Sequence, residues 1–162
     1  QHYNPTMLAL SKLDMPVVTA VNGVAAGIGC SLALAADFTL AAKSAYFLEA
    51  FVNIGLVPDG GTTWMLARQI GKARATEMMM LGERIPAEKA EAWGLIHAAV
   101  DDAELMARAT ALAERLGAAG VPVTLEIWPE MFHVFQARYP MLSQARTAIQ
   151  RLGQWAQAHV AK

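Results

Sequence analysis

The segment from Asn22 to Gly29 has the composition of a backbone that comes close to a ligand. Gly23, Gly27 and Gly29 stand among alanines, and residues this small let a backbone approach a bound group closely. An alanine-rich helix is expected directly afterwards, over about residues 30–36. Its first N–H groups have no partner within the helix and point towards whatever is bound. They suit an oxygen that gains negative charge, such as a thioester carbonyl that becomes an enolate.

A purely structural role is the alternative for this loop, because glycine-rich loops between a strand and a helix occur in many α/β proteins. The spacing of Gly23, Gly27 and Gly29 is not G-x-G-x-x-G, and no G-K-[ST] follows. Phosphate binding therefore has little support from the sequence.

Two acidic residues further along the chain could transfer protons. Asp59 lies in the turn Pro-Asp-Gly-Gly, where an aspartate is also an ordinary turn or capping residue. Glu49 lies two residues before Phe51, so on a strand both side chains would point to the same face. We expect Glu49 to be solvated or paired, with a second catalytic carboxylate as the alternative.

The elements that would position these residues alternate between strands and helices, which is typical of an α/β fold. Pro86 is expected at the first position of its helix. Strands are expected over residues 17–21, 38–42, 45–52 and 95–100, and helices over residues 4–13, 62–70, 73–81, 86–93 and 102–116.

Composition excludes several classes of function. The net charge of −1 over 162 residues gives no basic surface for nucleic acid, and no apolar run approaches the ~20 residues that cross a membrane. Cys30 is the only cysteine, so an internal disulfide is impossible, and a reducing cytoplasm is expected. No metal-ligand spacing occurs, and we predict no metal site.

Two longer stretches resemble the crotonase superfamily, which comprises enoyl-CoA hydratases and isomerases. They are PVVTAVNGVAAGIGCSLALAADF (residues 16–38) and SAYFLEAFVNIGLVPDGGTTWMLARQIGKARATEMMMLGERIPAEKAEAWGLI (residues 44–96). Within them, F-x-x-A-F-x-x-I-G-L-V-P-D-x-G-x-T-W resembles the branch of ring-epoxide isomerases that act in phenylacetate breakdown. The resemblance runs over about residues 4–116. It implies part of a crotonase spiral of repeated ββα turns, with the N-terminal part missing.

The resemblance also implies how an acyl-CoA thioester would be held. The family binds the thioester oxygen between two backbone N–H groups, of which one corresponds to Ile28. The other comes from a segment upstream of Gln1. Substrate contacts correspond to Ala26, Gly27, Gly29 and Phe51. Coenzyme A would be part of the substrate, so no separate cofactor is expected.

The same resemblance favours isomerisation over hydration. The two glutamates that hydratases use correspond to Ser31 and Phe51, which cannot do acid–base work, so hydration by this route is disfavoured. Asp59 corresponds to the acid of the isomerase branches and is the predicted catalytic residue. An acyl-CoA is the expected partner, with neither nucleic acid nor membrane. Homo-oligomers are expected too, because the family forms trimers.

The last part of the chain, residues 117–162, resembles a different family. VPVTLEIWPEMFHVFQARYP (residues 121–140) is similar to the C-terminus of hormone-sensitive-lipase-like esterases, which are α/β-hydrolases. A strand over residues 121–127 and a helix over residues 141–159 are expected there. The resemblance makes His133 a triad base, and Ser31 is the one near match to its nucleophile. A serine esterase is therefore one alternative, and an inactive fused product or interaction module is another. The expected division is residues 1–116 and 117–162.

Overall fold

The computed structural model describes residues 3–123 together with Thr147 and Gln154. The helix expected over residues 141–159 and His133 lie outside the described residues, apart from those two positions. For the strand expected over residues 121–127, the structure describes only residues 121–123, and these are not in a strand. In the described part of the chain, no helix is long and apolar enough to cross a membrane.

The strands of the described residues form two sheets of three strands each. The first has the order β1-β3-β6, with all pairs parallel. The second has the order β2-β4-β5, in which β2 and β4 are parallel and β5 is antiparallel to β4. The strands are β1 (Val18–Val21), β2 (Val24–Ala26), β3 (Phe38–Ala42), β4 (Tyr46–Leu48), β5 (Ile85–Pro86) and β6 (Ala98–Val100).

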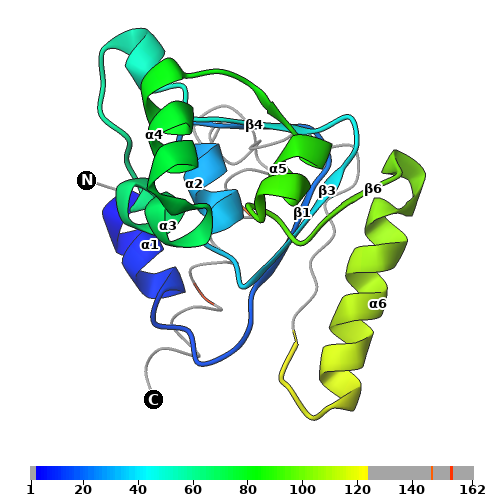
Figure 1. Ribbon diagram of the computed structural model, residues 1–162. Coiled ribbons are helices and arrows are strands. Elements are labelled where there is room, and N and C mark those ends of the chain that lie inside the picture. Colours follow the sequence, from blue (N-terminus) through cyan, green and yellow to red (C-terminus); the bar gives the residue numbers. More distant parts are fainter. Residues whose placement is uncertain (1–2, 124–146, 148–153, 155–162) are drawn as a thin grey trace.

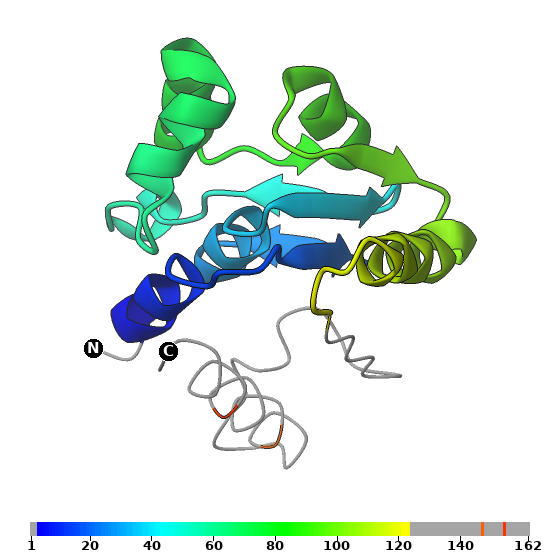
Figure 2. The same ribbon diagram turned by 90° about the horizontal axis from the view of Figure 1, so that it is seen from below.

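Successive pairs of strands contribute one strand to each sheet. β1 and β2 are the first pair, β3 and β4 the second, and β5 and β6 the third, and the pairs lie one above another (Figure 2). Helices follow the first two strand pairs. This path matches the repeated ββα turns that the resemblance implies.

The helices surround the two sheets. They are α1 (Tyr3–Leu10), α2 (Ile28–Leu34), α3 (Thr62–Gln69), α4 (Gly71–Leu81), α5 (Ala87–Trp93) and α6 (Leu105–Ala118), with 3₁₀ turns η1 (Val52–Ile54) and η2 (Asp102–Glu104). α6 lies along β1 and β3, on the opposite side from α3 and α4 (Figure 1). The core lies between these layers, where burial of apolar side chains stabilises the fold. Its largest members are Val21, Leu34, Phe47, Leu66, Met78, Ile85 and Leu105.

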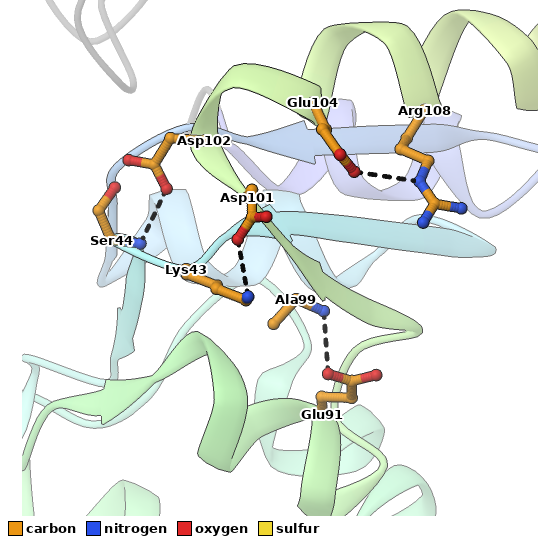
Figure 3. Close-up of polar contacts among 8 residues, drawn as sticks. All are labelled: Lys43, Ser44, Glu91, Ala99, Asp101, Asp102, Glu104 and Arg108. Atoms are coloured by element: carbon orange, nitrogen blue, oxygen red, sulfur yellow. Dashed lines mark hydrogen bonds and ion pairs between the residues drawn. The ribbon is translucent and has the colours of Figure 1, made fainter.

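Polar contacts join the end of β3 to the segment after β6 (Figure 3). The Lys43 ammonium pairs with Asp101 at 2.7 Å, and the N–H of Ser44 donates to Asp102 at 3.2 Å. The N–H of Ala99 in β6 donates to the Glu91 carboxylate at 3.1 Å. No strand of the described residues pairs with this N–H, so the glutamate side chain satisfies it. The Lys43–Asp101 pair is exposed, so it contributes little to stability.

The structure corrects several expected element boundaries. The strand expected over residues 45–52 ends at Leu48, so Glu49 and Phe51 do not share a strand face. β2 was not expected at all. Pro86 belongs to β5 and precedes the first residue of α5, instead of being that residue. The helix expected over residues 102–116 begins with η2 and ends two residues later than expected.

Candidate functional site

The small-residue loop leads from β2 into α2 through Gly27. The N–H of Gly27 donates to the carbonyl of Leu48 at 2.8 Å, which ties the loop to β4. The carbonyl of Gly27 accepts from the N–H groups of Cys30 and Ser31 at 2.9 and 3.1 Å. The N–H of Ile28 precedes these bonded groups, and no acceptor for it is found among residues 3–123. The loop therefore offers a free backbone donor at the start of α2.

A second turn, residues 57–61, packs directly on α2. Gly60 has φ +65°, and a Cβ placed on it would lie 2.6 Å from the Ser31 Cβ and 2.9 Å from the Ile28 Cδ1. These are shorter than any ordinary contact, so only glycine fits between the turn and the helix. The close approach places Asp59 beside the helix that carries the Ile28 N–H.

The Gly60→Ala variant is expected to lose roughly 2 kcal/mol of unfolding free energy, because it adds a clash to a strained φ. Gly61→Ala is the matched control, since Gly61 has φ +84° with nothing within 4 Å of the added Cβ. It should lose only about 1 kcal/mol, the cost of the positive φ alone. Urea unfolding of both variants measures the difference, and equal losses would contradict the close packing.

Four hydrogen bonds hold Asp59 in place, one of them from the Thr62 N–H to its backbone carbonyl at 3.4 Å. The hydroxyls of Ser31 and Thr62 donate to its backbone carbonyl at 3.0 and 2.8 Å. The N–H of Gly60 donates to its carboxylate Oδ1 at 2.5 Å. Asp59 is exposed, and within the described residues its Oδ2 accepts no hydrogen bond. The backbone is therefore fixed, while one carboxylate oxygen is free to meet a ligand.

An apolar pocket of about 280 Å³ lies beside Asp59. Its lining consists of Phe51, Leu56, Val57, Pro58 and Asp59. The Phe51 ring also approaches Gly27, because a Cβ built on that glycine would lie 3.8 Å from the Phe51 Cζ. The pocket thus combines an apolar lining with a single carboxylate, next to the small-residue loop.

The predicted site residues fall into two groups by position. Gly27, Ile28, Ser31, Phe51 and Asp59 are brought together by the two loops, although 28 residues separate Ser31 from Asp59. The remaining positions lie around them or outside the described chain: Ala26 ends β2, Gly29 is buried in α2, and His133 is not described.

Glu49 differs from its expected environment. It was expected to be solvated or paired, but it is 0% exposed, and neither carboxylate oxygen has a hydrogen-bond partner among the described residues. Burial raises the pKa of Glu49 from its ordinary 4.5 to about 7, partly offset by the nearby Cys30 and Thr62. Burial also raises the pKa of the Cys30 thiol well above its ordinary value. No sequence signal predicts the burial of Glu49, because this burial depends on how α2 and α3 pack in the folded chain.

Comparisons with known proteins bear on the family of the chain. The sequence model of the enoyl-CoA hydratase/isomerase family matches residues 1–159. The chain is 50% identical over 114 residues to the 1,2-epoxyphenylacetyl-CoA isomerase of Escherichia coli, covering 70% of this chain and 44% of that protein. It is 49% identical over 123 residues to a probable enoyl-CoA hydratase of Rhodobacter capsulatus, covering 74% of this chain and 48% of that protein.

A solved structure of an enoyl-CoA hydratase has a similar fold. The crystal structure of an enoyl-CoA hydratase from Mycobacterium avium subsp. paratuberculosis superposes with a TM-score of 0.70 at 35% identity. The match covers 97% of this chain and 58% of that chain. The present chain spans about half the length of the curated relatives it matches.

Proposed function

Because this chain belongs to the enoyl-CoA hydratase/isomerase family, we propose that it isomerises an acyl-CoA thioester. The observation that carries the proposal is the packing of the Asp59 turn on α2. It places the Asp59 carboxylate, which lines the apolar pocket, next to α2, whose first residue is Ile28 with its free N–H. This pairing of a backbone donor with a single acid is what proton transfer next to a thioester requires.

In the proposed reaction the thioester carbonyl accepts a hydrogen bond from the Ile28 N–H. Asp59 removes a proton from the acyl chain, the C–H electron pair moves into the carbonyl, and the enolate oxygen keeps its charge at that donor. Asp59 then returns the proton to a different carbon. A second backbone donor, from a segment outside this sequence, would complete the oxyanion hole. Loss of one such donor costs on the order of 10²–10³ in rate.

An arene-derived epoxide is the proposed acyl group. The support is the motif around Phe51 and Asp59 and the activity for which the similar Escherichia coli protein is named. In that case Asp59 would assist opening of the epoxide and expansion of the ring. Hydration has less support, because Ser31 and Phe51 offer no carboxyl to activate water. A probable hydratase among the relatives makes this choice one for experiment.

The remaining expectations stay proposals as well. Coenzyme A enters only as part of the substrate, and we propose a cytoplasmic homo-oligomer. The division at residues 116 and 117 and the esterase-like tail remain predictions, as does an inactive product. A serine esterase would need Ser31 and His133 to meet. Ser31 is 0% exposed, and its labelling by an organophosphonate would support that alternative.

Incubation of the chain with 1,2-epoxyphenylacetyl-CoA tests the proposed function. We expect a ring-expanded isomer of unchanged mass, resolved by liquid chromatography with mass spectrometry. A hydrated product, heavier by one water, would instead support the hydratase alternative. Circular dichroism shows whether the sample is folded, and a folded chain that forms no product would contradict the proposal.

A further inference from the structure

His97 is a titratable side chain that the proposed reaction does not use, and it lies where β3 and β6 begin to pair. The pairing of these strands starts with Leu40 opposite Ala98, so no residue of β6 stands opposite Thr39. His97, the residue before β6, makes the contacts there instead. Its backbone N–H donates to the Thr39 carbonyl at 2.9 Å. Its ring Nδ1 accepts the Thr39 N–H at 3.2 Å, so a side chain takes the place of a strand carbonyl.

The contact with Thr39 requires one particular protonation state of His97. A ring nitrogen accepts a hydrogen bond only through its lone pair, so Nδ1 must carry no proton and the neutral ring must hold its proton on Nε2. In the imidazolium form both ring nitrogens are donors, and Nδ1–H would point at the Thr39 N–H. Thr39 is only 3% exposed. A protonated ring in this position would therefore leave a poorly hydrated N–H without an acceptor, which is costly.

The surroundings of His97 leave its protonation to solvent. The strands β1, β3 and β6 and the helix α2 carry no charged residue, and the Phe38 ring packs on the His97 ring at 5.1 Å between centroids. Asp37, before β3, accepts the Val17 N–H at 2.8 Å. The other charged groups of the surrounding elements are Lys43, Asp101 and Asp102 at the opposite ends of β3 and β6, Glu88, Lys89 and Glu91 on α5, and Arg108, Glu114 and Arg115 on α6. No ion pair joins any carboxylate of residues 3–123 to His97, and the residue is exposed.

Thr39 also connects this contact to the helix of the candidate site. The Thr39 hydroxyl donates to the Ala33 carbonyl in the last turn of α2 at 3.0 Å. The Thr19 hydroxyl donates to the same carbonyl at 2.9 Å. Because α2 begins at Ile28, the two threonines hold one end of the helix whose other end offers the free N–H.

We infer that the His97 ring is a pH-sensitive switch at the start of the β3–β6 pairing. The neutral ring fastens Thr39 through Nδ1. When the Nδ1 lone pair takes a proton from solvent, that hydrogen bond breaks and the ring turns away from the Thr39 N–H. Histidine ordinarily changes its charge between about pH 5 and about pH 8, so the contact is closed at the alkaline end of this range and open at the acid end.

The change is local, because the backbone pairing from Leu40 to Ala42 does not depend on the imidazole. Release of Thr39 would weaken one of the two hydroxyl contacts on Ala33. An effect of this release on the Ile28 donor rests on the proposed function, whereas the switch itself does not.

Amide hydrogen exchange of the 162-residue chain tests the switch without any substrate. From about pH 8 to about pH 5, the Thr39 amide should lose roughly three- to tenfold of its protection after correction for the intrinsic pH dependence of exchange, as expected for one hydrogen bond. The Lys43 amide donates to the Val100 carbonyl at 2.9 Å, and this acceptor does not titrate, so it should show no such loss. Ionisation of Glu49 destabilises the chain at alkaline pH, which is the opposite direction, so the sign of the step identifies His97.

Two substitutions of His97 separate the hydrogen bond from the ring. Asparagine offers a side-chain oxygen that does not titrate, so His97→Asn should keep the Thr39 amide protected over the whole range. Phenylalanine keeps a ring that can pack on Phe38 but has no acceptor, so His97→Phe should exchange fast over the whole range. The exposed Lys72→Gln on α4 is the control and should keep the step.

Three results would overturn the inference. One is a loss of protection that survives in His97→Asn, and another is a Thr39 amide that stays protected in His97→Phe. The third is equal protection at both ends of the pH range in the unaltered chain, which decides the question even if a variant does not fold. A chain that shows the expected step but forms no isomer would count against the proposed function alone.

Discussion

Asp59→Asn is expected to lower isomerase turnover by about 10²–10⁴-fold, the usual contribution of a positioned general acid–base group. Asparagine keeps an oxygen that can accept from the Gly60 N–H, so the turn should keep its shape. The backbone carbonyl of residue 59 also stays available to Ser31 and Thr62. What the variant loses is the ability to carry a proton between two carbons of the acyl chain. Steady-state kinetics with the epoxide substrate measures the loss, mainly in kcat.

Asp101→Asn is the matched control for this experiment. Asp101 is exposed and pairs with Lys43 after β6, and it lines neither the pocket nor the loops of the candidate site. Its variant should turn over at the unaltered rate. If Asp59→Asn also kept the full rate, Asp59 would be an ordinary turn residue, as its place in Pro-Asp-Gly-Gly allows.

Local sequence patterns correctly predicted several helices and strands. β3 runs over Phe38–Ala42 as expected, and α4 and α5 end just before Gly82 and Gly94. β2 was missed because Val24-Ala25-Ala26 lies among glycines and has no alternating pattern. It exists because it pairs in parallel with β4. β5 was missed for the same reason, since two residues gain a strand partner only in the folded chain.

Contacts between distant segments explain the part of the site that the sequence could not predict. The resemblance selected Ile28 and Asp59, but no pattern shows that the Ser31 hydroxyl meets the Asp59 carbonyl. The strand expected over residues 45–52 made Glu49 and Phe51 neighbours on one face. In the structure the strand ends at Leu48, so Phe51 lines the pocket while Glu49 is enclosed. Burial of this kind is decided by tertiary packing, not by local propensity.

The stability of the chain is expected to fall as pH rises through neutrality, because of Glu49. Its pKa is raised from 4.5 to about 7 in the folded state, so between these values the folded chain binds more protons than the unfolded chain. Stability is therefore highest, for this group, below about pH 4.5 and is lost as pH passes 7. Each unit between the two pKa values corresponds to about 1.4 kcal/mol, which gives a loss of about 3 kcal/mol.

Urea unfolding of the unaltered chain and of Glu49→Gln at several values from about pH 5 to about pH 8.5 measures this loss. Glutamine cannot ionise, so the stability of the variant should change little over that range. The two chains should be closest in stability at the acid end, and the variant should be the more stable at the alkaline end. Parallel pH profiles would show that Glu49 does not hold its proton in the folded state. The enclosed carboxyl would then need a partner outside the described residues.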